Sequence, residues 1–370
     1  MGRGWLAIFA SALLALPILS QPVLAEWGAD DWISNVIGPE RLENGDEFGC
    51  HGYEGVDTVV ENWVISECRD YLMGLTNASR WGERPLSFGI KANEIDAKTA
   101  GSLSQSGFII VGDRISDAPA GLVGMYRNGA SLEKGVADID LLKQAEEDSL
   151  VSIHWRARVG DLRVREDKDV ISWLEDQPVW FTTWGEWYLH RLTAESTSIA
   201  SEGNSIFTQS PQSTIWDVPG TLRINFEGSI VSVHDSSGLD YPVLNETDRK
   251  LTIGWRETND GVLLTQAPGS NVTIQLSNEI ESIEVEVMRT FNDLNHSVTV
   301  VGHQTTNLFR WTQDFSNSDL VFTWLIERPA KEEIGWLIPT LAASILVAAP
   351  ATIYYLLRKE QNLESNYHSN

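Results

Sequence analysis

The hydrophobic pattern is most pronounced near the end of the chain. Ile334–Leu357 runs for 24 residues without a charged side chain, and a helix needs about 20 apolar residues to cross a bilayer. Trp336 lies near one end of this run and Tyr354 near the other, where amphipathic rings favour the headgroup layer. Basic residues follow at Arg358 and Lys359. We predict a transmembrane helix over 334–357 and a short cytoplasmic tail over 358–370.

A second apolar run lies at the start of the chain. Residues 1–25 carry a single cation, Arg3, then an apolar stretch, and they end in Val23-Leu24-Ala25. This pattern is typical of a signal peptide cleaved after Ala25, and the alternative is an uncleaved anchor. An export signal with one C-terminal span predicts a single-pass type I protein of the cell membrane, with its N-terminal ectodomain outside.

One soluble helix is evident from its period. Apolar residues of Val56–Leu75 recur at the i, i+3, i+4, i+7 spacing of a single helix face. Asp57 is the expected N-cap and Gly74 the expected stop. Cys68 lies on the apolar face, and Cys50 is the only other cysteine in the chain. An isolated cysteine pair in an exported region predicts one disulfide, which would pin the N-terminal arm to the helix.

The remainder of residues 26–192 has shorter, strand-like patterns. We therefore expect this lobe to be α+β with a mostly antiparallel sheet. A short helix is expected over Ile139–Glu147. The expected strands are Ser106–Val111, Gly121–Tyr126, Leu150–Val159, Asp161–Arg165, Val170–Leu174 and Val179–Leu189.

Residues 193–214 are rich in Ser and Thr and show no period, which predicts a linker. Residues 215–330 then contain short alternating segments separated by Gly and Asp turns, which predicts an antiparallel β-sandwich, immunoglobulin-like in general architecture, next to the membrane. The fold class expected is thus mainly β, with an α+β N-terminal lobe and one transmembrane helix. The sandwich strands expected are Thr221–Phe226, Ile230–His234, Lys250–Trp255, Gly261–Thr265, Val272–Leu276, Ile283–Thr290, Ser297–His303, Leu308–Thr312 and Leu320–Ile326.

The net charge of the chain limits the classes of partner that it can bind. The formal net charge of −25 repels phosphate groups, so nucleic acid is not an expected partner. The expected ectodomain also contains four N-glycosylation sequons, which begin at Asn77, Asn245, Asn271 and Asn295.

One segment combines aromatic rings with polar groups. If Val179–His190 were a strand, its period of two would place Trp180, Trp184, Glu186 and Tyr188 on one face. Rings beside a carboxylate suit a sugar-binding surface, so these four residues are the candidate ligand-binding residues. Glu186 with Glu175 or Asp176 would also offer the paired carboxylates of a glycosidase. The alternative is that the rings are core packing.

No catalytic, nucleotide-binding or metal-binding motif occurs in the chain, so we predict no catalytic residue, no metal site and no cofactor. In the predicted span, small residues recur every fourth position at Thr340, Ser344, Ala348 and Thr352. Such a ridge allows close helix packing. We expect a binding or interaction module at the cell surface. The alternatives are a glycan-binding or glycan-processing enzyme, and an accessory subunit of a membrane complex. The bilayer is the expected partner, together with another membrane protein or a surface glycan.

Overall fold

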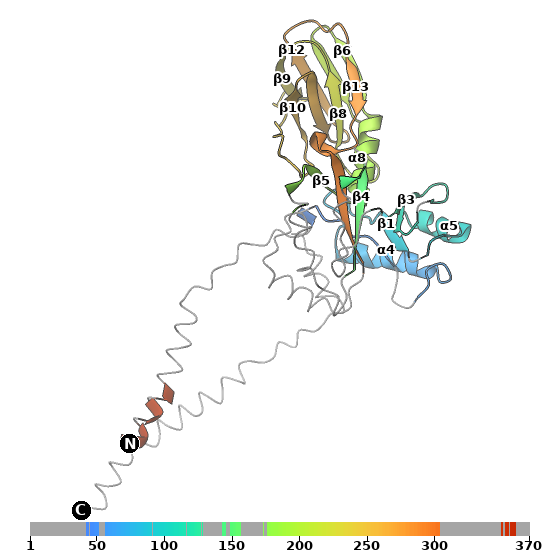
Figure 1. Ribbon diagram of the computed structural model, residues 1–370, viewed down its shortest axis with the longest axis vertical. Coiled ribbons are helices and arrows are strands. Elements are labelled where there is room, and N and C mark those ends of the chain that lie inside the picture. Colours follow the sequence, from blue (N-terminus) through green and yellow to red (C-terminus); the bar gives the residue numbers. More distant parts are fainter. Residues whose placement is uncertain are drawn as a thin grey trace, which may run out of the picture. The chain divides into compact units, whose positions relative to one another are not determined.

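The computed structural model describes the part of the chain that contains the lobe, the sandwich and a short C-terminal helical segment (Figure 1). The described residues are 42–43, 45–51, 56–90, 92–115, 117–126, 128, 143–145, 149–156, 173, 176–303, 349–350, 352–354 and 356–359. These residues are mostly β, with two antiparallel sheets and a few helices.

The N-terminal part begins with a helix and a small parallel sheet. Its elements are α4 (Trp63–Leu75), β1 (Ser87–Ile90), α5 (Ala97–Gln105), β2 (Ile110–Asp113) and β3 (Val123–Tyr126). β2 lies between β1 and β3 and is parallel to both. α5 starts where it does because the Asp96 side chain accepts a hydrogen bond from the Thr99 amide, 2.7 Å away. In the core of this part, the ring of Phe88 on β1 meets that of Phe108 edge to face, with centroids 5.2 Å apart.

The predicted disulfide is confirmed. Cys50 and Cys68 are bonded, with Cα atoms 5.9 Å apart. Cys50 also forms a parallel bridge with Phe88 of β1, so the disulfide joins the first part of the chain to α4 and to the edge of the sheet. The predicted helix start is wrong. Asp57 forms a turn by accepting from the Val59 amide, and α4 begins only at Trp63.

A second parallel sheet corrects the expected strand direction. β4 (Leu150–Arg156), β14 (His296–His303) and β5 (Val179–Phe181) form a sheet in that order, with β14 parallel to both neighbours. The predicted mostly antiparallel sheet is therefore wrong, and this part of the chain alternates strands and helices as α/β proteins do. The pattern of apolar residues within a short strand does not reveal the direction of its partner.

In chain order the sandwich lies between β5 and β14, the last two strands of this parallel sheet, and it follows α8 (Trp184–Ser196). One sheet, here called the outer sheet, has the order β6-β7-β12-β9, and the other, the inner sheet, has the order β10-β11-β8-β13. All pairs within both sheets are antiparallel. The strands are β6 (Ser198–Glu202), β7 (Ser205–Gln209), β8 (Gly220–Asn225), β9 (Ile230–Asp235), β10 (Gly254–Thr258), β11 (Gly261–Gln266), β12 (Asn271–Leu276) and β13 (Glu284–Val287).

The two sheets share one apolar core. Ile206, Val233 and Ile274 of the outer sheet pack in one cluster with Leu222 and Leu264 of the inner sheet. Because β6 and β7 belong to this core, the sandwich starts at Ser198, and the predicted linker over 193–214 is wrong for residues 193–209. Those residues form the end of α8 and a hairpin.

A third layer covers the other face of the inner sheet. α8 packs on β8 and β13, and the short 3-10 helix η2 (Phe291–Asp293) packs on β8 and β11. The approach of α8 is close, since a Cβ at Gly220 would lie 2.3 Å from the Ala194 amide nitrogen. Leu263, which follows buried Val262 on β11, is also fully buried. α8 can be seen beside β8 and β13 in Figure 1.

Within the described part of the chain, no helix has the length and hydropathy that a membrane crossing requires. Residues 334–348 of the predicted span lie outside the described residues, together with Thr340, Ser344 and Ala348 of the ridge. The same is true of residues 1–25 and of the strands expected over 161–165, 308–312 and 320–326. Thr352 lies in a described helical stretch, 352–354.

Candidate functional site

The predicted ligand-binding face does not exist as a strand face. β5 ends at Phe181, and α8 begins at Trp184. Thr183 caps this helix, since its hydroxyl accepts a hydrogen bond from the Glu186 amide at 3.2 Å. Thr183 and Glu186 have the S/T-x-x-E spacing of a capping box, which is a start signal for a helix that the strand prediction overlooked.

Burial places these side chains in the core instead. Trp180 is fully buried, Trp184 and Glu186 are 6% and 3% exposed, and Tyr188 is half-buried. The Trp184 indole donates to the Ser152 hydroxyl at 3.0 Å. Buried rings cannot stack on a sugar, so the geometry that motivated the ligand-binding prediction is absent.

Glu186 is the centre of a buried polar network. Arg80 forms an ion pair with it, with 3.0 Å between Nη2 and Oε2. The Trp81 indole donates to the same oxygen, and the Thr182 hydroxyl donates to Oε1 at 3.1 Å. The same Arg80 nitrogen donates to the Leu251 carbonyl at 2.9 Å. Since Leu251 precedes β10, this guanidinium joins α8 to the sandwich.

A second carboxylate lies in the same network. Glu47 Oε2 accepts a hydrogen bond from the Gly185 amide at the start of α8, at 2.7 Å. Burial raises the pKa of Glu47, and the nearby Glu186 carboxylate adds to this rise, while hydrogen bonds from Ser87, Gly185 and Thr183 oppose it. Glu47 Oε1 is buried and has no hydrogen-bond partner among the described residues. The network thus holds two acids and one guanidinium.

This network connects distant parts of the chain. It joins four segments that are distant in the sequence, at Glu47, Arg80, Glu186 and Leu251. The central carboxylate, Glu186, is paired with Arg80 and enclosed by protein, whereas Glu47 accepts a hydrogen bond from the Gly185 amide. Removing one member of such a buried pair leaves an uncompensated charge, which is strongly destabilising.

His190 is a second buried polar residue of α8. Its ring packs on Trp180 with centroids 4.8 Å apart, and Nε2 lies 2.9 Å from the Thr221 hydroxyl. The Thr221 hydroxyl is in turn 2.9 Å from that of Thr265. Burial lowers the pKa of His190 to about 3, so the imidazole is neutral at physiological pH. A neutral, enclosed histidine of this kind connects α8 to the inner sheet.

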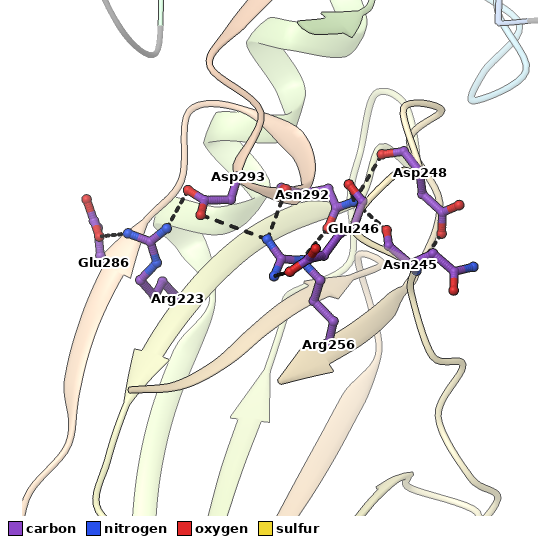
Figure 2. Close-up of polar contacts among 8 residues, drawn as sticks. All are labelled: Arg223, Asn245, Glu246, Asp248, Arg256, Glu286, Asn292 and Asp293. Carbon is purple, nitrogen blue, oxygen red and sulfur yellow. Dashed lines mark hydrogen bonds and ion pairs between the residues drawn. The ribbon is translucent and has the colours of Figure 1, made fainter. Parts of the chain in front are cut away.

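A third network lies where the sandwich chain returns toward β14 (Figure 2). Asn292 has a left-handed backbone, with φ 56°. Its amide nitrogen donates to the carbonyls of Asn245, Glu246 and Asp248 at 2.8–3.4 Å. Its amide oxygen accepts from Arg256 Nε at 2.7 Å. The two N–H groups of one buried amide are therefore shared by three carbonyls of the β9–β10 connection.

Two arginines extend this network to the surface of the inner sheet. Arg223 pairs with Glu286 of β13 and with Asp293, and Arg256 lies 3.9 Å from Asp293 and from Glu246. Asp293 also has a positive φ of 61°. These contacts hold η2 against the sandwich, and their partners are all within the protein.

The outward face of the outer sheet is different in character. Cross-strand pairing places Ala200, Phe207, Thr273 and His234 in one row across the four strands. Phe207 is 42% exposed at the middle of this row. The positions that share this face by the pairing register are Ser198, Ala200, Glu202, Ser205, Phe207, Gln209, Ser232, His234, Asn271, Thr273 and Gln275. Only Glu202 among them is a carboxylate, although the chain has a net charge of −25.

The four sequon asparagines Asn77, Asn245, Asn271 and Asn295 are all exposed. Among the described residues, no group of three or more His, Cys, Asp or Glu side chains has the arrangement of a metal site. Comparisons with protein-family models, with curated proteins and with solved structures found no match to this chain. The candidate site is therefore defined by geometry alone, and the outward face of the outer sheet is the strongest candidate.

Proposed function

We propose that the protein is a single-pass type I membrane protein whose ectodomain is a binding module for another membrane or surface protein. In this proposal residues 1–25 direct export, residues 334–357 anchor the chain, and the immunoglobulin-like sandwich presents the outward face of its outer sheet to the partner. The observation that carries the proposal is the nearly uncharged character of this face on a strongly acidic chain.

The chemistry of the face favours a protein partner. The centres of protein interfaces are depleted in charged residues and enriched in aromatic ones. Phe207 is the exposed ring, and hydroxyl and amide groups such as those of Thr273 and Gln275 surround it. A glycan platform would need several exposed rings, whereas Trp180 and Trp184 are buried. The bond between Cys50 and Cys68 supports export, because disulfides persist in oxidising compartments.

The first test concerns topology. The full chain, expressed in a host with export machinery, is expected to remain in membranes after an alkaline carbonate wash. Both cysteines are expected to react with a maleimide reagent only after reduction. Recovery of the chain from the cytosol with two reactive thiols would overturn the proposal.

The second test concerns the face. Photo-crosslinking from position 273 in intact membranes is expected to yield a defined protein adduct, which Phe207→Lys should reduce at least tenfold. Val243→Lys is the matched control, since Val243 is also exposed but lies beside β10 of the inner sheet. Loss of the adduct in both variants, or adducts with lipid or glycan alone, would contradict the proposed role.

A further inference from the structure

The sandwich has four edge strands, and three of them are protected. The Tyr241 amide donates to the Val233 carbonyl, so the segment after β9 covers that edge. The Leu244 amide donates to the Trp255 carbonyl, which covers the edge of β10. β13 carries Glu284 and Glu286, and charged side chains discourage pairing at an edge.

Among the described residues, no segment covers the fourth edge, β6. Its sequence from Ser198 to Glu202 contains no proline, no lysine and one charge. A two-residue turn with Gly203 at φ 60° joins it to β7, so Glu202 and Ser205 are the hydrogen-bonded pair that closes the hairpin. Hydrogen-bonded and non-hydrogen-bonded pairs alternate along an antiparallel ladder.

The alternation identifies which backbone groups face the open edge. Ala200 pairs with Phe207 in the ladder, and Ile199 and Ser201 are the non-hydrogen-bonded positions. The N–H and C=O groups of Ile199 and Ser201 therefore point away from β7. Within the described part of the chain they make no hydrogen bond to another residue. An uncovered row of this kind is a template for another strand.

We propose that β6 pairs antiparallel with β6 of a second copy of this chain, about a two-fold axis at Ala200. Ile199 then opposes Ser201 of the second copy, and by symmetry the two pairs make four backbone hydrogen bonds. Ala200 meets its own equivalent at a non-hydrogen-bonded position, where Cα atoms approach to about 4.5 Å and a small side chain fits. This inference does not depend on the proposed function.

The charges of β6 are compatible with a second copy in this register. Two copies with a net charge of −25 each repel one another wherever acidic surfaces meet. In this register Glu202 opposes Ser198 of the second copy, so the one carboxylate of the strand does not face its equivalent. Ile199 packs against the sandwich core, and in this register it faces the small side chain of Ser201 of the second copy. The strands are only five residues long, which predicts a reversible, concentration-dependent dimer rather than an obligate one.

Cysteine scanning tests the register. The full chain with Ala200→Cys is expected to form a covalent dimer under mild oxidation. Ser198→Cys is the matched control, because its equivalents would lie four residues apart along the strand, about 14 Å. A mixture of Ser198→Cys and Glu202→Cys chains is expected to cross-link, although neither variant does so alone. Equal cross-linking of Ser198→Cys and Ala200→Cys would overturn the proposal.

A second measurement tests the hydrogen bonds. Ser201→Pro removes an N–H that points to the open edge and leaves the ladder with β7 intact. Sedimentation of the detergent-solubilised full chain is expected to show at least tenfold weaker association for this variant than for Ser201→Ala, at an unchanged melting temperature. The proposed dimer would be contradicted by a wild-type chain that is monomeric at all concentrations. It would also be contradicted if the Ile199 and Ser201 amides of the monomer resisted hydrogen exchange with solvent.

Discussion

His190 and Thr221 join two parts of the molecule, with 2.9 Å between the imidazole Nε2 and the hydroxyl oxygen. His190 belongs to α8, which follows β5 of the parallel sheet, whereas Thr221 belongs to β8 of the sandwich. The same imidazole packs on Trp180. The inserted sandwich thus rests on a shared core.

The enclosure of His190 predicts a dependence of stability on pH. The pKa of about 3 in the folded state lies below the ordinary value of 6.5, so the unfolded chain binds a proton first as the pH falls. The neutral imidazole therefore makes its full contribution to the free energy of unfolding above pH 6.5. Below pH 6.5 this contribution is lost, by at most about 1.4 kcal/mol per pH unit. Equilibrium unfolding between pH 7 and 5 measures this slope. His190→Gln should reduce it, and an identical slope in the two proteins would contradict the assignment.

The buried pair of Arg80 and Glu186 predicts a large effect of a conservative change. Glu186→Gln leaves the guanidinium without its carboxylate, which should destabilise the fold by about 3–5 kcal/mol in denaturant unfolding. Glu195→Gln is the matched control, because its ion pair with Arg191 is exposed and should contribute less than about 1 kcal/mol.

A double replacement separates pairing from packing in this network. Removing both charges, as in Arg80→Met with Glu186→Gln, avoids the uncompensated charge and should restore part of the lost stability. Additive losses in the double variant would show that the two side chains do not act as a pair.

The sandwich could be predicted in outline where its core positions are aliphatic. Val272, Ile274 and Leu276 alternate with polar residues, and β12 was expected at nearly these bounds. The hairpin of β6 and β7 was not predicted, because one of its core positions is the polar residue Thr208. That hydroxyl is buried by donating to Gln266 at 2.6 Å, a partner 58 residues away. A buried polar residue whose hydrogen-bond partner is distant in the sequence cannot be distinguished from a loop residue by the local pattern.

The polar networks were harder to predict than the strands. Glu186 was selected as a candidate, but its partner Arg80 lies 106 residues before it. A local signal was available, since Thr183 lies three residues before Glu186 and marks the start of α8. This capping pattern predicts a helix where a strand was expected. β14 pairs with β4, and the whole sandwich lies between these two strands in the sequence. A local sequence pattern therefore cannot predict this pairing.

The disulfide gives a prediction that is independent of charge. Cys50 and Cys68 are 18 residues apart, and closing a loop of this length is worth about 3 kcal/mol in the chain-entropy model. The double variant Cys50→Ser with Cys68→Ser should lose about this much stability. Reductant should lower the melting temperature of the wild type but not that of the variant, and an equal effect on both would exclude the bridge as the cause.

Asn292 provides a test that separates backbone conformation from side-chain contacts. Asn292→Gly removes the amide but tolerates φ 56°, whereas Asn292→Ala removes the same contacts and keeps a Cβ in the left-handed region. Both variants should be destabilised, since Arg256 and three carbonyls lose a partner. The alanine variant should be the less stable of the two by about 1 kcal/mol in denaturant unfolding. Asn278→Ala, at an exposed turn, should change little. Equal stability of the glycine and alanine variants would mean that this backbone conformation imposes no cost.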